Sequence, residues 1–246
     1  MPIPVKTFAL FKNYPVIHGF STRQGGVSKG YFASLNLGLN TLDKDYAVKE
    51  NRNIFLKQLG LEHGNLVFPQ QIHSANIAIV NEPGIIPECD ALVTNIKNLV
   101  LTIQTADCFP VFIFDPVKNV CAIIHSGWRG TAAAIVPKTI QKMVTEFACA
   151  ASDLLAAIGP GIQQRNYQVD RMTANNFAKE FILIDGPDHF RLDIQGAIKK
   201  QLTDNGVLPK HIETDETCTL EAAEFYYSYR RDGNKSGRMM GIIALK

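Results

Sequence analysis

The chain has 246 residues, of which 46% are hydrophobic and 20% charged, the proportions of a globular protein with a buried core. Its 25 Lys and Arg residues nearly balance its 23 Asp and Glu residues, so the formal net charge is +2. This balance, without a basic block or an acidic tail, argues against nucleic-acid binding through a broad positive face. We also expect no membrane partner, because no apolar run reaches the ~18 residues that a spanning helix needs.

The N-terminal stretch "MPIPVKTFALFKNYPV" is interpreted as mature sequence. Two prolines interrupt it early, and no small-residue cleavage site follows a clean apolar core. The five cysteines are odd in number and scattered through the chain. A chain of this length can build a core without disulfide bonds, so we expect reduced thiols and a cytoplasmic location.

Segments with the patterns of strands and of helices alternate along the chain. The expected strands are rich in β-branched and aliphatic residues: "VIHGFST", "NIAIV", "ALVT", "LVLTIQT", "VFIFDP", "VCAIIH", "LLAAIGP" and "GRMMGIIAL". Helices are expected over residues 45–60, directly after Gly130, over about 171–182 and over 193–205. With no internal repeat or linker, this alternation predicts a single mixed α/β domain over residues 1–246.

The helix expected after Gly130 has the clearest apolar face. Its positions i, i+4, i+7, i+8 and i+11 are all apolar: Val136, Ile140, Met143, Val144 and Phe147. Pro137 lacks a backbone N–H and fits such a helix only in its first turn or at a kink. The pattern therefore predicts a helix that packs one face against a core.

Three potential ligands for a soft or borderline metal ion stand at strand edges or in loops. They are His73 in "QQIHSAN", Cys108 in "QTADCFP" and His125 in "IIHSGWRG". Two imidazoles and one thiolate suit zinc, and three protein ligands leave a fourth position open for water or substrate. The ligands are 35 and 17 residues apart, so a site requires "LVLTIQTADC" and "VCAIIH" to end side by side. Structural histidines and a core cysteine are the alternatives.

Two glycines bracket an arginine in "HSGWRG", directly before the expected helix. Gly127 and Gly130 allow close backbone approach, and a helix N-terminus offers free N–H groups and a positive dipole end. Arg129 adds a planar fork suited to a phosphate or a carboxylate. A tight turn with a solvated arginine explains the pattern equally well. Arg23, in "TRQGG", repeats the combination on another loop.

Eight motifs in chain order, from about Phe20 to the C-terminus, together resemble the YfiH-like family. They are "STRQGGVSKGYFASLNLG", "ENR", "QQIHSANIAIV", "ECDALVT", "TADCFPVFIFDP", "HSGWRG", "AAIGPGI" and "FYYSYRRDGNKSGR". That family is labelled polyphenol oxidase with a laccase domain, peptidoglycan editing factor and purine nucleoside phosphorylase. The resemblance implies a layered α/β/β/α sandwich with mixed sheets, and zinc bound by His73, Cys108 and His125.

The resemblance also implies an activity on purine nucleosides. The expected reactions are phosphorolysis of adenosine, inosine and methylthioadenosine, and hydrolytic deamination of adenosine. The partners would be small purine nucleosides and inorganic phosphate, with Zn²⁺ as the cofactor and copper as the less favoured metal. Family positions that resemble pocket lining fall on Arg23, Asn36, Gln71 and Arg129.

Catalytic roles are expected for Asp107, Cys108, His125 and Arg129. Zinc held by the cysteine and histidine ligands would lower the pKa of water from ~15.7 toward ~7, giving a hydroxide able to attack C6 of adenosine. Phosphorolysis needs phosphate held near C1′, a role for Arg129 and the helix N-terminus. We interpret Asp107 as the group that transfers a proton to the base or orients a ligand. A capping or turn aspartate is the equal alternative.

One segment departs from the family pattern. The family commonly carries one or two cysteines before the tyrosine of the I-G-P segment, and a glutamate after it. Here the segment is "IGPGIQQRNYQV", with Arg165, Asn166 and Gln168 near the tyrosine. The roles of those family residues therefore do not transfer, and the substrate preference could differ.

Two other functions remain open. A copper polyphenol oxidase of the blue type needs two histidines, a cysteine and a weak axial ligand, but a further three-copper cluster would need many more than the six histidines present. Alternatively, Cys108 as nucleophile and His125 as base would serve a hydrolase or amidase that acts on peptidoglycan precursors. Metal content separates the last function from a zinc enzyme, because a zinc-bound thiolate is a poor nucleophile.

Overall fold

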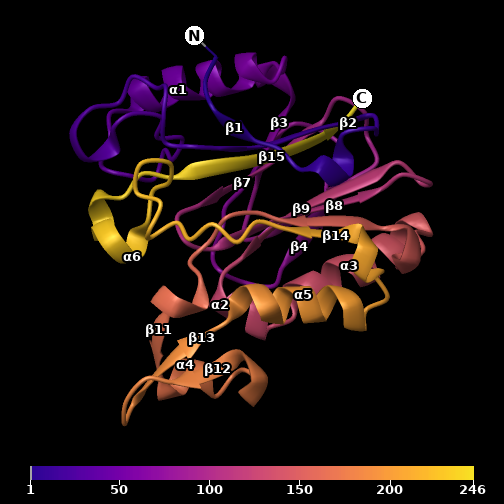
Figure 1. The fold of residues 1–246 in the computed structure, drawn as a ribbon. Helices are drawn as coiled ribbons and strands as arrows, with labels where there is room; N and C mark the ends of the chain where they lie inside the picture. Colours follow the sequence, from indigo (N-terminus) through magenta and orange to yellow (C-terminus); the bar gives the residue numbers. More distant parts are fainter. Residues whose placement is uncertain (1) are drawn as a thin grey trace.

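The computed structural model describes residues 2–246 and contains two six-stranded sheets that pack face to face (Figure 1). In spatial order, the first sheet contains β1 (Val5–Lys6), β2 (Val16–Ser21), β15 (Met239–Leu245), β7 (Val100–Thr105), β3 (Leu66–Pro69) and β5 (Gly84–Ile86). The second contains β14 (Ile212–Thr214), β10 (Leu155–Ile158), β8 (Phe109–Asp115), β9 (Val120–Ser126), β6 (Ala91–Thr94) and β4 (Ile77–Ile79).

Both sheets mix parallel and antiparallel pairs. In the first, β1, β2, β15 and β7 pair antiparallel, whereas β3 is parallel to β7 and to β5. In the second, the central strands β10, β8, β9 and β6 pair antiparallel, and the edge strands β14 and β4 pair parallel to their neighbours. The mixed sheets predicted for this chain are confirmed.

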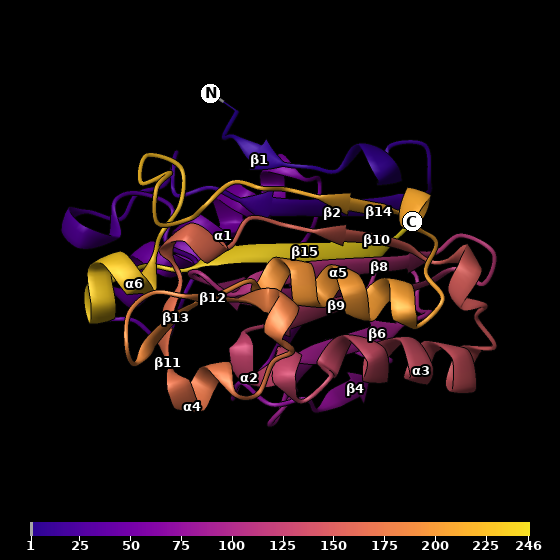
Figure 2. The same cartoon turned by 60° about the horizontal axis from the view of Figure 1, so that its bottom comes forward.

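Helices cover the outer faces of the two sheets. Helix α1 (Asp45–Gln58) lies on the first sheet, where Phe55 and Leu56 pack with residues of β7 and β15 (Figure 1). Helices α3 (Ile135–Phe147) and α5 (Ile194–Asp204) lie side by side on the second sheet (Figure 2). The order of layers is helix, sheet, sheet, helix, so the expected α/β/β/α sandwich is confirmed.

The central strands are buried on both faces, which explains their continuous apolar sequences. On β8, Phe112 and Phe114 belong to the core between the sheets, whereas Val111 and Ile113 pack on the side of α3 and α5. Side chains of a strand alternate between its two faces, so a strand covered on both sides needs apolar residues at every position. The expected strands corresponding to β2, β4, β6 to β10 and β15 are all present.

Residues 128–147 form two helices, where one helix directly after Gly130 was expected. The short helix α2 (Trp128–Ala132) ends before Ala134, whose left-handed backbone (φ 60°) separates it from α3. Pro137 lies in the first turn of α3, where its missing N–H costs no helical hydrogen bond. Most of the predicted stripe is buried or half-buried, but Val144 is exposed, so its assignment to the packed face is wrong.

The helix predicted over 171–182 is also wrong. Helix α4 covers only Arg171–Ala174, because the Asn176 side chain donates hydrogen bonds to the carbonyls of Met172 and Thr173. These bonds close the end of the helix and compete with its continuation. The chain instead builds an additional three-stranded sheet, in the order β11 (Gln168–Asp170), β13 (His189–Leu192) and β12 (Ile182–Ile184), at the bottom of Figure 1.

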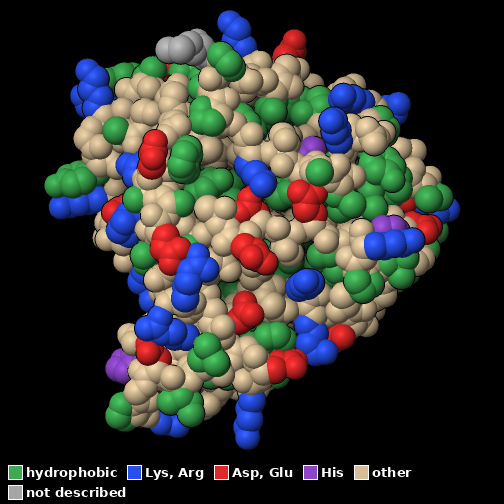
Figure 3. Space-filling view, in the orientation of Figure 1, with side chains coloured by type: hydrophobic (Ala, Val, Ile, Leu, Met, Phe, Trp, Pro, Cys, Tyr) green, Lys and Arg blue, Asp and Glu red, His purple; other side chains and the backbone are tan. Residues whose placement is uncertain are grey.

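The remaining short helix, α6 (Tyr229–Asp232), lies at one end of the sandwich, at the left of Figure 1. All five cysteines are unpaired. No helix within residues 2–246 has the length and apolar character needed to cross a bilayer. On the face shown in Figure 3, acidic and basic side chains are interspersed, as expected from the near balance of charges.

Candidate active site

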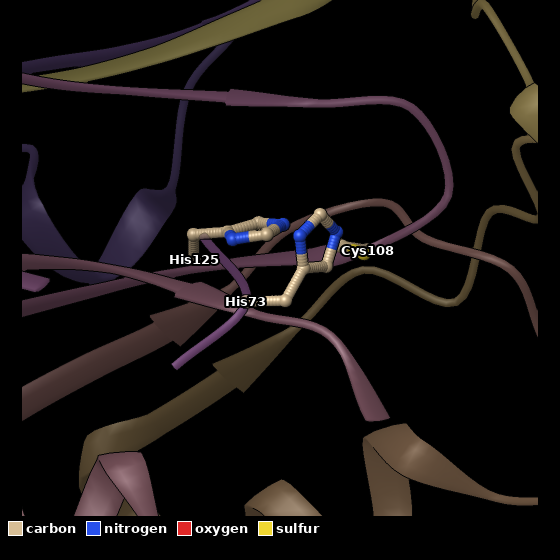
Figure 4. A group of neighbouring side chains, drawn as sticks. All are labelled: His73, Cys108 and His125. Carbon is tan, nitrogen blue, oxygen red and sulfur yellow. The ribbon is translucent and has the colours of Figure 1, made fainter. Parts of the chain in front are cut away.

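His73, Cys108 and His125 converge from three parts of the chain (Figure 4). His73 lies in the loop after β3, Cys108 directly precedes β8, and His125 is near the end of β9. Their ligand atoms lie within 4.8 Å of one another, and the two imidazole rings are nearly perpendicular at a centroid distance of 4.8 Å. Within residues 2–246 this is the one group of three or more His, Cys, Asp or Glu side chains with such spacing.

The pairing of β8 with β9 in the second sheet brings Cys108 and His125 together, more than the end of the strand "LVLTIQT" does. β7 belongs to the first sheet, and the chain crosses to the second sheet between β7 and β8. Cys108 lies at the end of that crossing, and β8 then pairs with β9 so that Pro110 is opposite His125. The antiparallel β8–β9 ladder therefore places the thiol beside the imidazole.

Asp90 holds the loop that carries His73. Its carboxylate is fully buried and accepts hydrogen bonds from the backbone N–H groups of Ile72, His73 and Ser74 at 3.3, 3.1 and 2.6 Å, and from the Ser74 hydroxyl at 2.8 Å. His73 itself has a left-handed backbone with φ 60°, a conformation uncommon for residues other than glycine. The carboxylate thus stabilises an unusual loop that points His73 toward Cys108.

The same carboxylate orients His125. Nδ1 of His125 donates to Oδ1 of Asp90 at 2.8 Å, so Nε2 is the nitrogen that remains for Cys108 or a metal ion. A carboxylate behind a histidine fixes the tautomer and ring orientation and raises the basicity of the other nitrogen, as is common at metal sites. Asp90 was not singled out in the sequence, although it is part of the "ECDALVT" motif.

The electrostatics of the group favour a charged thiolate. Burial opposes ionisation of Cys108, but the charges of His125 and His73 and their hydrogen bonds outweigh it, so the pKa of the thiol is lowered. Burial also opposes charge on His125, but Cys108 and Asp90 together raise its pKa. The thiolate is the form of cysteine that binds metals and acts as a nucleophile.

Gly127 leaves the space that the cysteine occupies. A Cβ atom at this position would lie 2.8 Å from Sγ of Cys108 and 3.5 Å from Cδ2 of His73. Its φ of −86° is accessible to any residue, so the glycine is required by space and not by backbone conformation. This finding assigns a specific role to one of the two glycines in "HSGWRG".

A cavity of about 380 Å³ opens directly onto the three side chains. Its volume is within the ~300–1,000 Å³ of typical small-molecule sites. The walls combine aromatic, cationic and amide side chains with the metal-ligand group: Asn40, Pro69, Gln71, His73, Gln104, Thr105, Ala106, Asp107, Cys108, His125, Tyr167, Tyr229, Arg230 and Arg238. Both tyrosines, both arginines and Asn40 were not predicted from the sequence, although Tyr229, Arg230 and Arg238 belong to the motif "FYYSYRRDGNKSGR".

Asp107 lies in this cavity with both carboxylate oxygens engaged. Oδ1 accepts a hydrogen bond from the Thr219 hydroxyl and Oδ2 accepts one from the backbone N–H of Arg230, both at 2.7 Å. The residue is buried and has a left-handed φ of 92°. The carboxylate therefore connects the loop before Cys108 to the C-terminal segment that forms a wall of the cavity.

The other residues expected in the pocket have different positions. Gln71 lines it, with its side-chain amide paired to the backbone of Gln104 at 2.7 and 2.8 Å. Arg23 lies outside the lining, where it stacks on Tyr227 and donates to backbone carbonyls. Asn36 is fully buried behind the wall.

Arg129 is exposed and lies outside the cavity lining. Its guanidinium packs 4.4 Å from the centroid of the Trp128 ring. Burial raises the pKa of the Tyr167 hydroxyl, and the charges of Arg230 and Arg129 act in the opposite direction. Helix α2, which carries Arg129, has only five residues.

The segment that departs from the family pattern supports one wall from behind. Arg165 and Asn166 both donate to the carboxylate of Glu221, and the carbonyl of Gln168 accepts a hydrogen bond from Arg230. Tyr167 is the residue of this segment that reaches the cavity. The departing residues thus fix the loop, and the tyrosine contributes the surface.

A family model described as multi-copper polyphenol oxidoreductase laccase matches residues 17–246. The chain is 32% identical over 258 residues to purine nucleoside phosphorylase YlmD of Bacillus subtilis, covering 95% of this chain and 90% of the relative. It is 36% identical over 238 residues to purine nucleoside phosphorylase of Deinococcus radiodurans, with the same two coverages.

Two crystal structures have closely similar folds. YlmD from Geobacillus stearothermophilus superposes with a TM-score of 0.93 at 31% identity, covering 97% of this chain and 94% of the other. Bacillus licheniformis YfiH superposes with a TM-score of 0.91 at 31% identity, covering 94% and 93%. With the match of the family model, these similarities show that the chain belongs to the YfiH-like, laccase-domain family.

Proposed function

We propose that the protein is a zinc-dependent purine nucleoside enzyme. Its reactions are phosphorolysis of adenosine, inosine and methylthioadenosine, and hydrolytic deamination of adenosine. The observation that carries the proposal is a His–Cys–His group at the base of a cavity walled by two tyrosines and two arginines. The relatives named purine nucleoside phosphorylase support the same substrate class.

The donor set suits zinc. Two imidazoles and one thiolate match the ligands of catalytic zinc sites, and all three side chains line the cavity. The carboxylate of Asp90 behind His125 is the outer contact that such ligands commonly have. When bound, zinc supplies a Lewis acid that lowers the pKa of water and makes hydroxide available near neutral pH for addition at C6 of adenosine.

Tyr167 and Tyr229 provide the surfaces for the purine base. Aromatic side chains stack on a flat heterocycle and bury it with little loss of conformational freedom. Both rings are themselves fixed by cations: Arg230 lies 5.0 Å from the Tyr167 centroid and Arg238 lies 5.6 Å from that of Tyr229. The two tyrosines therefore hold the base, and the two arginines contribute positive charges to the cavity wall.

Asp107 contributes by position in this account. Its two hydrogen bonds hold Thr219 and the backbone of Arg230, so the carboxylate keeps α6 against the cavity. In this proposal, proton delivery to the leaving purine falls to water or to the phosphate in the cavity.

A second candidate function, that of a cysteine hydrolase, is based on the spatial arrangement of three side chains. Cys108, His125 and Asp90 follow one another as nucleophile, base and orienting carboxylate do in cysteine hydrolases. Such a site would hydrolyse amides in peptidoglycan precursors without metal. Copper oxidase chemistry has less support, because a multi-copper enzyme needs further clusters and residues 2–246 contain one ligand group.

The test is to incubate metal-analysed protein with adenosine, with and without inorganic phosphate, and to identify the products. The proposal predicts adenine and ribose 1-phosphate with phosphate, and inosine and ammonia without it. The Cys108→Ser variant serves as the matched inactive control. A zinc-loaded protein that leaves adenosine unchanged under both conditions contradicts the proposal, and amide hydrolysis by the metal-free protein supports the hydrolase.

A further inference from the structure

The guanidinium of Arg238 lies in the cavity wall with an unused edge. Its Nη1 donates to the carbonyls of Ser236 and Gly237 at 2.8 and 2.9 Å. Within residues 2–246, neither Nε nor Nη2 has a protein acceptor, and no carboxylate forms an ion pair with this side chain. The side chain is half-buried, and burial lowers its pKa.

The free edge has the geometry for an oxyanion. The Nε–H and Nη2–H bonds of a guanidinium are parallel and match two oxygens of a phosphate or carboxylate. A half-buried cation without an ion-pair partner has lost part of its hydration, so an anion in the cavity would restore favourable contacts.

The surrounding chain fixes this orientation. The fully buried Asn36 accepts hydrogen bonds through Oδ1 from the backbone N–H of Arg238 at 2.8 Å and of Gly38 at 3.1 Å. A Cβ on Gly38 would lie 2.7 Å from Cγ of Arg238, so the glycine makes room for the side chain. Asn36, expected from the family resemblance to line the pocket, therefore acts through the position of Arg238.

The charges around the cavity favour an anion. Arg230 is a second cation in the lining, and its Nη1 donates to the carbonyl of Gln168. Asp107 is the one carboxylate of the lining, and both its oxygens are engaged by the chain. The exposed Arg129, by contrast, lies on Trp128 and outside the lining.

We propose that Arg238 binds the inorganic phosphate co-substrate through Nε and Nη2, with Asn36 and Gly38 as positioning residues. The inference rests on the proposed phosphorolysis. In that step a phosphate oxygen forms a bond to C1′ while the C1′–N9 bond breaks. The electron pair of the broken bond goes to the purine, which takes up the proton that the phosphate loses.

The kinetic test measures inosine phosphorolysis across a phosphate titration for Arg238→Gln and Arg238→Lys. We expect R238Q to raise the KM for phosphate about 10- to 100-fold, the loss typical of one charge-assisted contact. R238K keeps the charge but loses the planar fork, so we expect its KM for phosphate to lie between those of the wild type and R238Q. Zinc content stays near wild type, and Arg171→Gln, an exposed arginine in an ion pair with Asp188, is the matched control.

A second pair of variants tests the positioning residues. Gly38→Ala displaces Arg238 and should raise the KM for phosphate more than the KM for inosine. Gly64→Ala is its control, because a Cβ there meets nothing within 4 Å. A merely structural role for Gly38 would lower stability without this selective change in the KM for phosphate.

A binding test separates the inference from the proposed function. The zinc-loaded protein is titrated with inorganic phosphate alone and followed by ³¹P NMR. Weaker binding in R238Q supports the site even when the wild type converts no nucleoside, in which case the proposed function alone fails. Wild-type phosphate affinity in R238Q overturns the inference. So does the reverse pattern, in which Arg129→Gln loses the phosphate affinity that R238Q keeps.

Discussion

Oδ1 of Asp90 accepts a hydrogen bond from Nδ1 of His125 at 2.8 Å, and both side chains are buried. The pKa of Asp90 is lowered to about 2: burial opposes its charge, but the hydrogen bonds and charge of His125 and the hydrogen bonds of Ser74 outweigh it. One carboxylate thus orients one candidate metal ligand, His125, and through the backbone N–H of His73 it holds the loop of another. The candidate metal centre depends on this residue although it is not a ligand.

Asp90→Asn should weaken metal binding without removing a ligand. The amide presents an NH₂ group either to His125 or to the backbone N–H groups, so one set of contacts is lost. We expect the affinity for zinc to fall about 10- to 100-fold, as for other outer contacts of metal ligands. Competition with a chelator measures this affinity. Ser74→Ala removes only the hydroxyl contact to Asp90 and is the milder control; equal affinities in D90N and wild type would contradict the role.

Gly127→Ala should disturb the candidate metal centre only because the added methyl group takes up space beside Cys108. The added Cβ would lie 2.8 Å from Sγ of Cys108, closer than such atoms approach in proteins, so the thiol must move. We expect zinc occupancy to fall well below that of wild type while the far-ultraviolet circular dichroism stays unchanged. Gly64→Ala, which adds the same methyl group in open space, should keep full occupancy. Full occupancy in G127A would show that the thiol is not a ligand.

Asp107→Asn distinguishes a positioning residue from a proton donor. The amide NH₂ must face either the Thr219 hydroxyl or the backbone N–H of Arg230, so one hydrogen bond to the C-terminal wall is lost. A contact of this kind contributes ~1.5–3 kcal/mol. We expect a higher KM for nucleosides and a pH profile of kcat with unchanged limbs. Loss of a limb in kcat, with KM preserved, would instead assign proton transfer to Asp107.

Strands and helices were predicted correctly from the sequence where the local residue pattern agrees with the burial in the fold. Strands such as β8 and β9 are covered on both faces, so their uninterrupted apolar residues predicted them well. The helix over 171–182 failed because one side chain, Asn176, closes α4 after a single turn. Hydrophobic periodicity gives little signal of such local competition between a side chain and the helix backbone.

The cavity walls could not be derived from spacing, because they come from distant segments. Asp107 contacts residues 112 and 123 positions away, and the approach of those residues is set by how the two sheets pack. Family motifs located the three potential ligands and Gln71. They did not distinguish Arg238, which faces the cavity, from Arg23, which stacks behind it on Tyr227.

His18 should make the fold sensitive to acid. Burial lowers its pKa from 6.5 to about 4, opposed by the charge of Glu213 and the hydrogen bond with the backbone of Phe8. Between these values the unfolded chain binds the proton and the folded protein does not. The free energy of unfolding therefore falls as the pH drops from about 6.5 to 4, by up to ~3 kcal/mol from this group.

The His18→Gln variant tests this linkage. Glutamine does not titrate but can still accept the hydrogen bond that the backbone N–H of Phe8 donates to His18 at 2.8 Å. Urea unfolding at pH 7 and pH 4.5 should show a smaller acid loss of stability for the variant than for the wild type. Parallel pH dependences for the two proteins would show that His18 is not the group responsible.

The most direct test of the account is a zinc titration of activity. Protein stripped of metal by a chelator is reloaded with increasing zinc, and phosphate-dependent cleavage of inosine is measured against bound zinc. We expect activity that rises in proportion to zinc and saturates at about one ion per chain, with neither binding nor activity in Cys108→Ala. Phosphorolysis that survives complete removal of metal, or that returns with copper and not with zinc, would contradict it.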